Sequence, residues 1–198
     1  MIKKRCSWVG NDALYISYHD HEWGNPIYDD QSLFEALILE TFQSGLSWIT
    51  ILRKRENFRN AFSQFIPREV ALYDEHKVNL LLKNKGIIRH ELKIRSAISN
   101  ARAFLNIQEE FGSFNAYIWG FVKRKPIQNK EDSLKNIPVK TELSKKISID
   151  LKNRGFKFVG PTVVYSFIQA VGLVNDHLVS CYRHRELSKI NNEANFLN

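Results

Sequence analysis

Residues 155–181 read GFKFVGPTVVYSFIQAVGLVNDHLVSC, and this stretch predicts how two helices of the chain meet. Gly155 and Gly160 flank four residues, a spacing that suits a sharp turn. Pro161 follows the second glycine, and proline is favoured in the first turn of a helix because no backbone donor is needed there. Four apolar residues then recur at helical spacing and form one face: Val164, Phe167, Ile168 and Val171. With a helix expected over residues 142–153, the stretch predicts a helical hairpin.

The start of the second hairpin helix is also a candidate phosphate site. A helix that begins after a glycine turn points free backbone N–H groups outward, and such groups bind anions. The same residues are equally typical of a packed hairpin that binds nothing. The hairpin alone therefore predicts a fold element and only suggests a ligand.

A candidate metal centre lies at the end of the same stretch. His177 and Cys181 stand four residues apart, so a helix would place both side chains on one face, as two ligands of one ion require. The other cysteine, Cys6, is followed by His19. These residues would form a closed tetrahedral zinc site that clamps the N-terminal residues onto the end of the domain. Two alternatives stay open: unrelated free thiols, and a thiol-based redox or metal sensor.

The composition is that of one globular domain. The chain has 198 residues, of which 43% are hydrophobic and 12% aromatic, so it can bury a sizeable core. Two cysteines cannot build a disulfide framework, and the sequence contains neither a signal-peptide core nor an apolar run of membrane length. We therefore expect a cytosolic protein.

The net charge of +8 favours a partner that carries phosphates. Basic residues gather in three segments, 53–59, 83–95 and 123–125. Each segment is also typical of a solvated helix face, so the charge by itself is a weak indication of nucleic-acid binding.

Most of the chain shows helical spacing, and no strand signal is strong enough to name. Helices are expected over residues 32–42, 48–62, 92–104 and 113–122, with a short one from Pro67. Residues 123–139 hold two prolines and little periodicity, which predicts a surface loop. The polar residues 186–198 predict a frayed tail. The expected fold is all-α, with a single helical domain over residues 1–185.

One carboxylate stands out, because Glu40 lies in a segment that is otherwise almost wholly apolar. A buried carboxylate needs a partner or a function. A structural ion pair is one explanation. The other explanation is a pocket for a flat, cationic ring, because aromatic faces and a carboxylate both attract positive charge. Aromatic residues occur on both sides of it in the chain: Tyr15, Tyr18, Trp23 and Trp48.

Several motifs together carry a resemblance to a known family. They read CSW at 6–8, YISYHDHEWGNP at 15–26, ETFQSGLSWITILRKRENFR at 40–59 and GIIRH at 86–90, and they continue through residues 154–177. The chain resembles DNA-3-methyladenine glycosylase I over nearly its whole length, from about Cys6 to Cys181. That family is similar to the helix-hairpin-helix glycosylases, all-α enzymes that flip a damaged base out of duplex DNA.

The resemblance implies two sets of site residues, which join the hairpin residues expected from the glycine turn. The zinc ligands fall on Cys6, His19, His177 and Cys181. The residues of the base pocket fall on Tyr18, Glu40 and Trp48, with Trp23 close by. The hairpin residues expected to contact DNA are Gly155, Lys157, Gly160 and Thr162.

The implied activity is hydrolytic excision of 3-methyladenine from double-stranded DNA by a monomeric enzyme, which releases the free base. Glu40 would accept hydrogen bonds from the flipped, cationic base. No lysine in an apolar setting adjoins Glu40, so strand cleavage by a lyase step is not expected. The alternative is a zinc-stapled DNA-binding module without chemistry.

One position departs from the pattern of many hairpin glycosylases, which carry an aspartate just after the hairpin helix. The chain has Asn175 and Asp176 there. An amide cannot act as a general base. Whether Asp176 takes that role or caps the metal-bearing helix stays open at the level of sequence.

Overall fold

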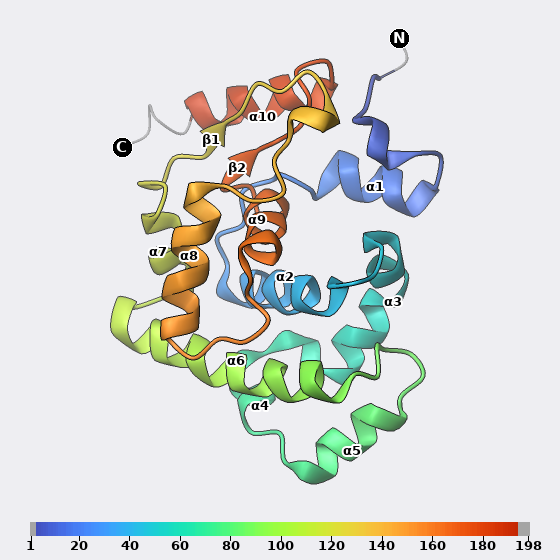
Figure 1. Cartoon of the computed structure of the whole chain (residues 1–198), viewed down its shortest axis with the longest axis vertical. Helices are drawn as coiled ribbons and strands as arrows, with labels where there is room; N and C mark the ends of the chain where they lie inside the picture. The colour runs from blue at the N-terminus through green and yellow to red at the C-terminus, as the bar shows by residue number, and fades with distance from the viewer. Residues whose placement is uncertain (1–2, 194–198) are drawn as a thin grey trace.

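The computed structural model describes residues 3–193 (Figure 1). Within these residues the chain forms ten α-helices: α1 (Ala13–His21), α2 (Asp30–Gln43), α3 (Trp48–Ala61), α4 (Pro67–Ala71), α5 (Glu75–Lys83), α6 (Glu91–Phe111), α7 (Phe114–Gly120), α8 (Glu142–Asn153), α9 (Pro161–Ala170) and α10 (Tyr182–Glu193). Three short 3-10 turns accompany them: η1 (Ser7–Val9), η2 (Ser63–Phe65) and η3 (Leu134–Asn136). The prediction of a helical fold is confirmed. No helix within residues 3–193 combines the length and the apolar character needed to cross a bilayer.

Helix α2 lies at the centre of the molecule (Figure 1). It contacts α3, α6, α7 and α9, and its residues from Leu37 to Phe42 are all buried. A helix that is buried on every side must be surrounded by other elements, so α2 organises the core. Asp29 caps its first turn by accepting from Ser32 N at 2.8 Å. Asp30 accepts from two backbone N–H groups at the start of α7, which fixes α7 against α2.

The hairpin predicted around Gly155 and Gly160 is formed by α8 and α9, which pack against each other. Gly155 has φ +92°, a value that L side chains rarely adopt, and it turns the chain at the end of α8. Gly160 is the N-cap of α9, and Pro161 occupies the first helical turn, as expected. Helix α9 packs on α2, so the hairpin is attached to the centre of the core.

The loop predicted for residues 123–139 contains structure that the sequence did not indicate. Ile127–Gln128 (β1) pairs in parallel with Val174–Asn175 (β2), and the turn η3 follows. The ladder is short: Ile127 N donates to Leu173 O at 2.9 Å and Asn129 N to Asn175 O at 3.2 Å. Strands of two residues are too short to show alternation, which explains why no strand was predicted.

The tail predicted after Arg185 is wrong for the residues that the structure describes. Helix α10 continues to Glu193, and Leu187 is 1% exposed. Leu187 lies beside Gly24, so one apolar side chain docks the helix on the segment that follows α1. Residues 194–198 lie outside the described part of the chain.

Gly172 generates a prediction about stability. It has φ +77°, and a Cβ atom there would lie 2.6 Å from the backbone at Asn25 and Pro26. We expect Gly172→Ala to lower the free energy of unfolding by roughly 3 kcal/mol or more, because the cost of the positive φ and the cost of the clash with the backbone are added together. Gly112→Ala is the matched control: φ is +80° there, but no atom lies within 4 Å, so a cost of about 1 kcal/mol is expected. Equal costs in denaturant titrations would contradict the close approach.

Candidate active site

A cavity of about 280 Å³ opens between α1, α2, α3 and α9. Its lining is mostly aromatic, with a few polar groups: Trp8, Tyr15, Tyr18, Trp23, Glu40, Gln43, Trp48, Leu134, Ile137, Ser166 and Gln169. This size is at the lower end of small-molecule sites, which suits a single flat ring. The four pocket residues expected from sequence (Tyr18, Trp23, Glu40 and Trp48) all lie in this lining.

Glu40 is the only carboxylate in the lining of this cavity. Its side chain comes from the middle of α2 and is 4% exposed, and Oε2 has no hydrogen-bond partner. Burial raises the pKa of Glu40 from 4.5 to about 8, because the charged form loses its hydration. No ion pair of Glu40 is present among the described residues, so the structural explanation is not supported. A buried acceptor without a partner indicates a ligand group that donates to it.

Two groups of rings form the walls. The rings of Tyr18 and Trp48 lie with centroids 5.5 Å apart, next to Glu40. Trp48 Nε1 is buried and has no partner, so the wall also offers a free donor. The second group is centred on Trp8, whose ring packs on Tyr15 at 4.9 Å and on Trp23 at 5.1 Å. Aromatic walls around one carboxylate are suited to a planar, electron-poor ring.

Several lining residues were not predicted from sequence. In the sequence, Trp8 and Gln43 stand out only as members of motifs, and nothing singles out Ser166 and Gln169. Leu134 and Ile137 belong to the segment that was expected to be a surface loop. No periodic signal marks these residues, because they reach the cavity from η1, η3 and α9 only through the tertiary fold.

Asp176 does not act at the cavity. It is 2% exposed and accepts hydrogen bonds from Asn129, Tyr165 and Gln169. It is absent from the cavity lining, and the alternative of a helix cap is excluded because no helix follows Asp176 directly. The contact with Gln169 Nε2, at 2.7 Å, orients a side chain that does line the cavity. Asn175 is buried and bonds to Gln128 and to the carbonyl of His184.

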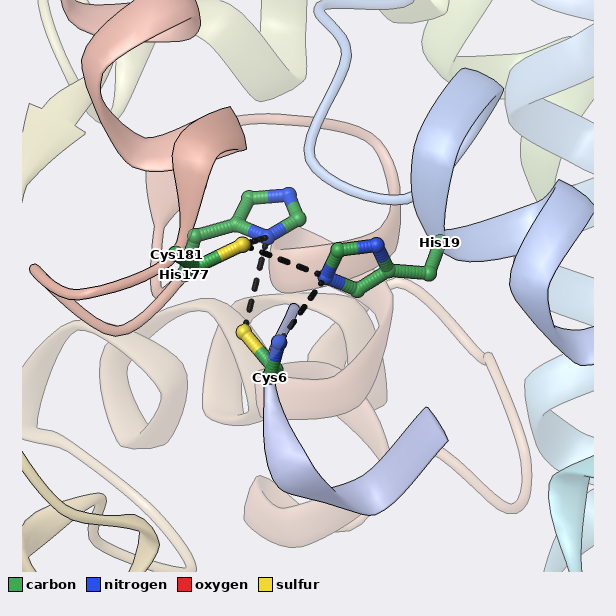
Figure 2. A group of neighbouring side chains, drawn as sticks. All are labelled: Cys6, His19, His177 and Cys181. Carbon is green, nitrogen blue, oxygen red and sulfur yellow. Dashed lines mark hydrogen bonds between the residues drawn. The ribbon is translucent and has the colours of Figure 1, made fainter. Parts of the chain in front are cut away.

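The four predicted metal ligands meet in one buried cluster (Figure 2). One ligand atom from each of Cys6, His19, His177 and Cys181 lies within 4.8 Å of the others. Cys181 Sγ is 3.4 Å from His19 Nε2 and 3.6 Å from His177 Nδ1, and Cys6 Sγ is 3.6 Å from His177 Nδ1. A tetrahedral zinc ion with bonds of about 2.0–2.3 Å separates its ligand atoms by roughly 3.3–3.8 Å, so these separations fit.

One part of the metal prediction is wrong. His177 and Cys181 do not share a helix face, because the chain between β2 and α10 forms a turn closed by Cys181 N donating to Leu178 O at 2.7 Å. The turn brings the two side chains together as a helix would have done.

The groups around the cluster orient both imidazoles. Asp20 lies 2.8 Å from His19 Nδ1 and is held by Arg5, so His19 Nε2 faces the sulfurs. Burial raises the pKa of Asp20, but the hydrogen bonds from Arg5 and His19 outweigh it and hold the pKa low. His177 Nε2 contacts the carbonyl of Trp23 at 3.1 Å, which directs Nδ1 toward the sulfurs. Such outer contacts are typical of metal-binding histidines.

The two cysteines interact with each other. A hydrogen bond between the sulfurs, together with burial, raises the pKa of Cys6, and the same hydrogen bond lowers the pKa of Cys181. A buried set of two sulfurs and two imidazoles is the donor chemistry of structural zinc sites, so the residues fit that ion.

The hairpin residues expected at DNA lie at the surface. Gly155, Lys157 and Thr162 are exposed and Gly160 is half-buried. No side chain caps the N-terminus of α9, so its first N–H groups face solvent. The N–H of Lys157 is different, because it donates to Asn100 Oδ1 at 2.8 Å and is not available to a phosphate.

Two of the three basic segments are partly neutralised. Arg53, Arg55 and Arg59 form ion pairs with acidic residues just before α1, just after α1 and in α2, respectively. Arg95 pairs with Glu75 and Glu91. These arginines are therefore more typical of solvated helix faces than of a phosphate-binding surface.

Comparison with known proteins gives a consistent result. The family model for methyladenine glycosylase matches residues 8–184. DNA-3-methyladenine glycosylase 1 of Escherichia coli (strain K12) is 51% identical over 178 residues, which cover 90% of this chain and 95% of that protein. A crystal structure of 3-methyladenine DNA glycosylase I is similar with a TM-score of 0.88 and 51% identity, covering 90% of this chain and 98% of the other.

A further similar structure contains a ligand. It is a tyrosine-to-phenylalanine variant of 3-methyladenine DNA glycosylase I in complex with 3-methyladenine, with a TM-score of 0.87 and 36% identity. The match covers 90% of this chain and 96% of that chain.

The raised pKa of Glu40 predicts how stability depends on pH. The folded chain holds this proton up to about pH 8, whereas the unfolded chain releases it near 4.5, so stability falls as pH rises between these values. Glu40→Gln has no such proton. We expect the variant to become more stable than wild type on going from pH 5 to pH 8, by on the order of 4 kcal/mol at the upper end.

The measurement is urea unfolding at several pH values. Glu56→Gln is the control, because it removes a carboxylate that is 76% exposed on α3. A constant difference between wild type and Glu40→Gln across this pH range would show that Glu40 is ionised in the empty pocket.

Proposed function

The chain belongs to the methyladenine glycosylase family, and from this membership we propose how its cavity and surfaces carry out the reaction. The protein is a DNA-3-methyladenine glycosylase, an N-glycosyl hydrolase that removes 3-methyladenine from DNA and begins its repair. The observation that carries the mechanism is the buried, unpartnered carboxylate of Glu40 in an aromatic cavity. A DNA-binding module without chemistry would not account for that carboxylate.

The chemistry places modest demands on the protein. Methylation at N3 gives the adenine a positive charge and weakens its bond to the sugar, and the base then leaves as a neutral molecule. The enzyme therefore has to flip the base, hold it and distinguish it from adenine. Tyr18 and Trp48 would stack on the flipped base, and Trp23 and Trp8 would form the opposite wall.

Glu40 would recognise the charge of the base. In the empty cavity its carboxyl group is held largely as the neutral acid at pH 7, because burial raises its pKa to about 8. A cationic ring stacked beside it favours the carboxylate, so Glu40 ionises as the damaged base arrives. The resulting pair lies in a site from which water is largely excluded, where Coulomb attraction exceeds its value in water. Normal adenine is neutral and gains no such attraction.

The remaining polar groups support a monofunctional enzyme. Asp176 already accepts three hydrogen bonds, and Asn175 is an amide, so neither serves as the general base. The one buried lysine of the described chain, Lys93, donates to the carbonyls of Phe42 and Ser44. Its amine is engaged by these two carbonyls and does not line the cavity, so a Schiff-base step is not expected.

Duplex DNA would bind across the hairpin. In this proposal α8 and α9 form a helix-hairpin-helix element, and the open N-terminus of α9 receives a backbone phosphate near Gly160 and Thr162. Lys157 adds charge beside it. The enzyme would act as a monomer in the cytosol, with double-stranded DNA as its partner.

A structural zinc ion would be held by Cys6, His19, His177 and Cys181. Bound there, it would supply no chemistry to the reaction, because all four positions are filled by the protein. Its effect on the cavity would be mechanical. The carbonyl of Trp23 contacts His177 Nε2, and the ring of Trp8 packs on the ring of His19 with centroids 5.3 Å apart. Through these contacts the cluster would support one wall of the cavity.

Glu40→Gln tests the recognition of the base. The amide keeps the shape of the carboxyl group but cannot become an anion. Its NH₂ group would also face the edge of the base that donates hydrogen bonds, so two donors would meet. We expect single-turnover release of 3-methyladenine, normalised to folded protein, to fall roughly ten- to several-hundred-fold. Affinity for the free base should fall with it, while binding of undamaged duplex stays near wild type. A Glu40→Gln enzyme with wild-type rate and base affinity would remove Glu40 from the mechanism.

Cys181→Ala tests the metal. We expect one zinc per chain in wild type, loss of that zinc in the variant, and a decrease in unfolding free energy of several kcal/mol. Elemental analysis and thermal melting are the measurements, with Ser180→Ala, a neighbouring exposed residue, as the control. Zinc-free wild-type protein, or an unchanged melting temperature in Cys181→Ala, would overturn the proposal.

A further inference from the structure

Helix α6 carries three buried polar residues on one face, and none of them lines the cavity. Lys93, Ser96 and Asn100 are 6%, 2% and 0% exposed. Buried polar groups are costly unless they bond, so their partners indicate what they do. Ser96 bonds only within its own helix, to the carbonyl of Lys93 at 2.8 Å. The other two reach outside α6, to two different segments.

Lys93 holds the segment between α2 and α3. Its Nζ donates to Phe42 O at 2.9 Å and to Ser44 O at 2.8 Å. Carbonyls at a helix C-terminus lack partners within the helix, and a cation there is favourable. The segment 43–47 begins with Gln43, which lines the cavity, and leads directly into Trp48. Lys93 therefore fixes the backbone at Phe42 and Ser44, and the positions of the cavity residues Gln43 and Trp48 depend on that backbone.

Asn100 holds the hairpin. Its Nδ2 donates to Lys157 O at 3.0 Å, and its Oδ1 accepts from Lys157 N at 2.8 Å. One side chain thus binds both backbone groups of a single residue in the turn between α8 and α9, which runs close to α6 (Figure 1). At the start of α6, the His90 ring lies 6.4 Å from the Phe158 ring of the same turn.

We propose that Lys93 and Asn100 are positioning residues, which hold the cavity segment 43–47 and the hairpin turn 155–160 at a fixed separation along α6. The two residues are seven positions apart, about 10 Å along the helix axis. A DNA strand bound at the hairpin would then place its flipped base at the cavity without a further change in the protein, as preorganised sites require. The inference rests on the proposed binding of duplex DNA by the hairpin.

The test uses Lys93→Met, Asn100→Ala and the double variant, with Ser96→Ala as the matched control from the same buried face. We expect Asn100→Ala to weaken binding of undamaged duplex about tenfold and to leave affinity for free 3-methyladenine within about twofold. Lys93→Met should lower the single-turnover excision rate about ten- to a hundredfold, with duplex binding unchanged. Lys93→Arg should restore part of that rate.

The double variant separates positioning from stability. Two residues this far apart should have additive effects on unfolding free energy. Their effects on excision should not be additive, because the register between hairpin and cavity is lost once either residue is removed. Additive losses of excision rate, or losses that track melting temperature alone, would overturn the inference. If Asn100→Ala does not fold, the isosteric Asn100→Asp, which loses the donor to Lys157 O, takes its place.

A final control keeps the two proposals distinct. Gly160→Val alters the hairpin without touching α6. If duplex binding by wild type does not depend on salt and Gly160→Val binds equally well, the hairpin is not the DNA-binding surface, and both proposals fail. If Gly160→Val weakens binding but Asn100→Ala does not, only the positioning role is overturned.

Discussion

The burial of residues 37–42 of α2 on every side is the constraint on which the rest of the structure depends. An apolar helix of this kind cannot lie at a surface, so α3, α6, α7 and α9 must enclose it. The one carboxylate in its buried middle, Glu40, is then carried into the interior with them. The same packing that stabilises the fold therefore also removes water from the Glu40 carboxyl group, and this desolvation raises its pKa.

Three candidate sites share few residues. The cavity is formed by side chains from η1 to α9, the Cys/His cluster by residues near the two ends of the described chain, and the hairpin by α8 and α9. Trp23 connects the first two, since its ring lines the cavity and its carbonyl contacts His177. Helix α6 contacts both the segment that leads to Trp48 and the hairpin, through hydrogen bonds of the buried side chains Lys93 and Asn100. The proposed positioning role of α6 would make activity depend on the relative placement of these segments.

Sequence reasoning found the features that local patterns encode. The hairpin was predicted from two glycines and a proline, and Glu40 from its apolar neighbours, because both signals lie within a few residues. The strands β1 and β2 were missed, since two residues show no period. Asn100 and Lys93 were missed for a different reason. A polar residue in an amphipathic helix is normally predicted to face solvent, and only the tertiary fold shows that these two are buried.

The meeting of Cys6 with His177 and Cys181 has a consequence for the order of folding. These contacts join positions separated by almost the whole chain, and contacts of such sequence separation form late, because a large loop must close first. During synthesis, Trp8 and Trp23 leave the ribosome long before the residues that support them. The aromatic wall therefore remains incomplete until the turn before α10 has emerged. A nascent chain that already contains every cavity residue would still lack a finished binding site.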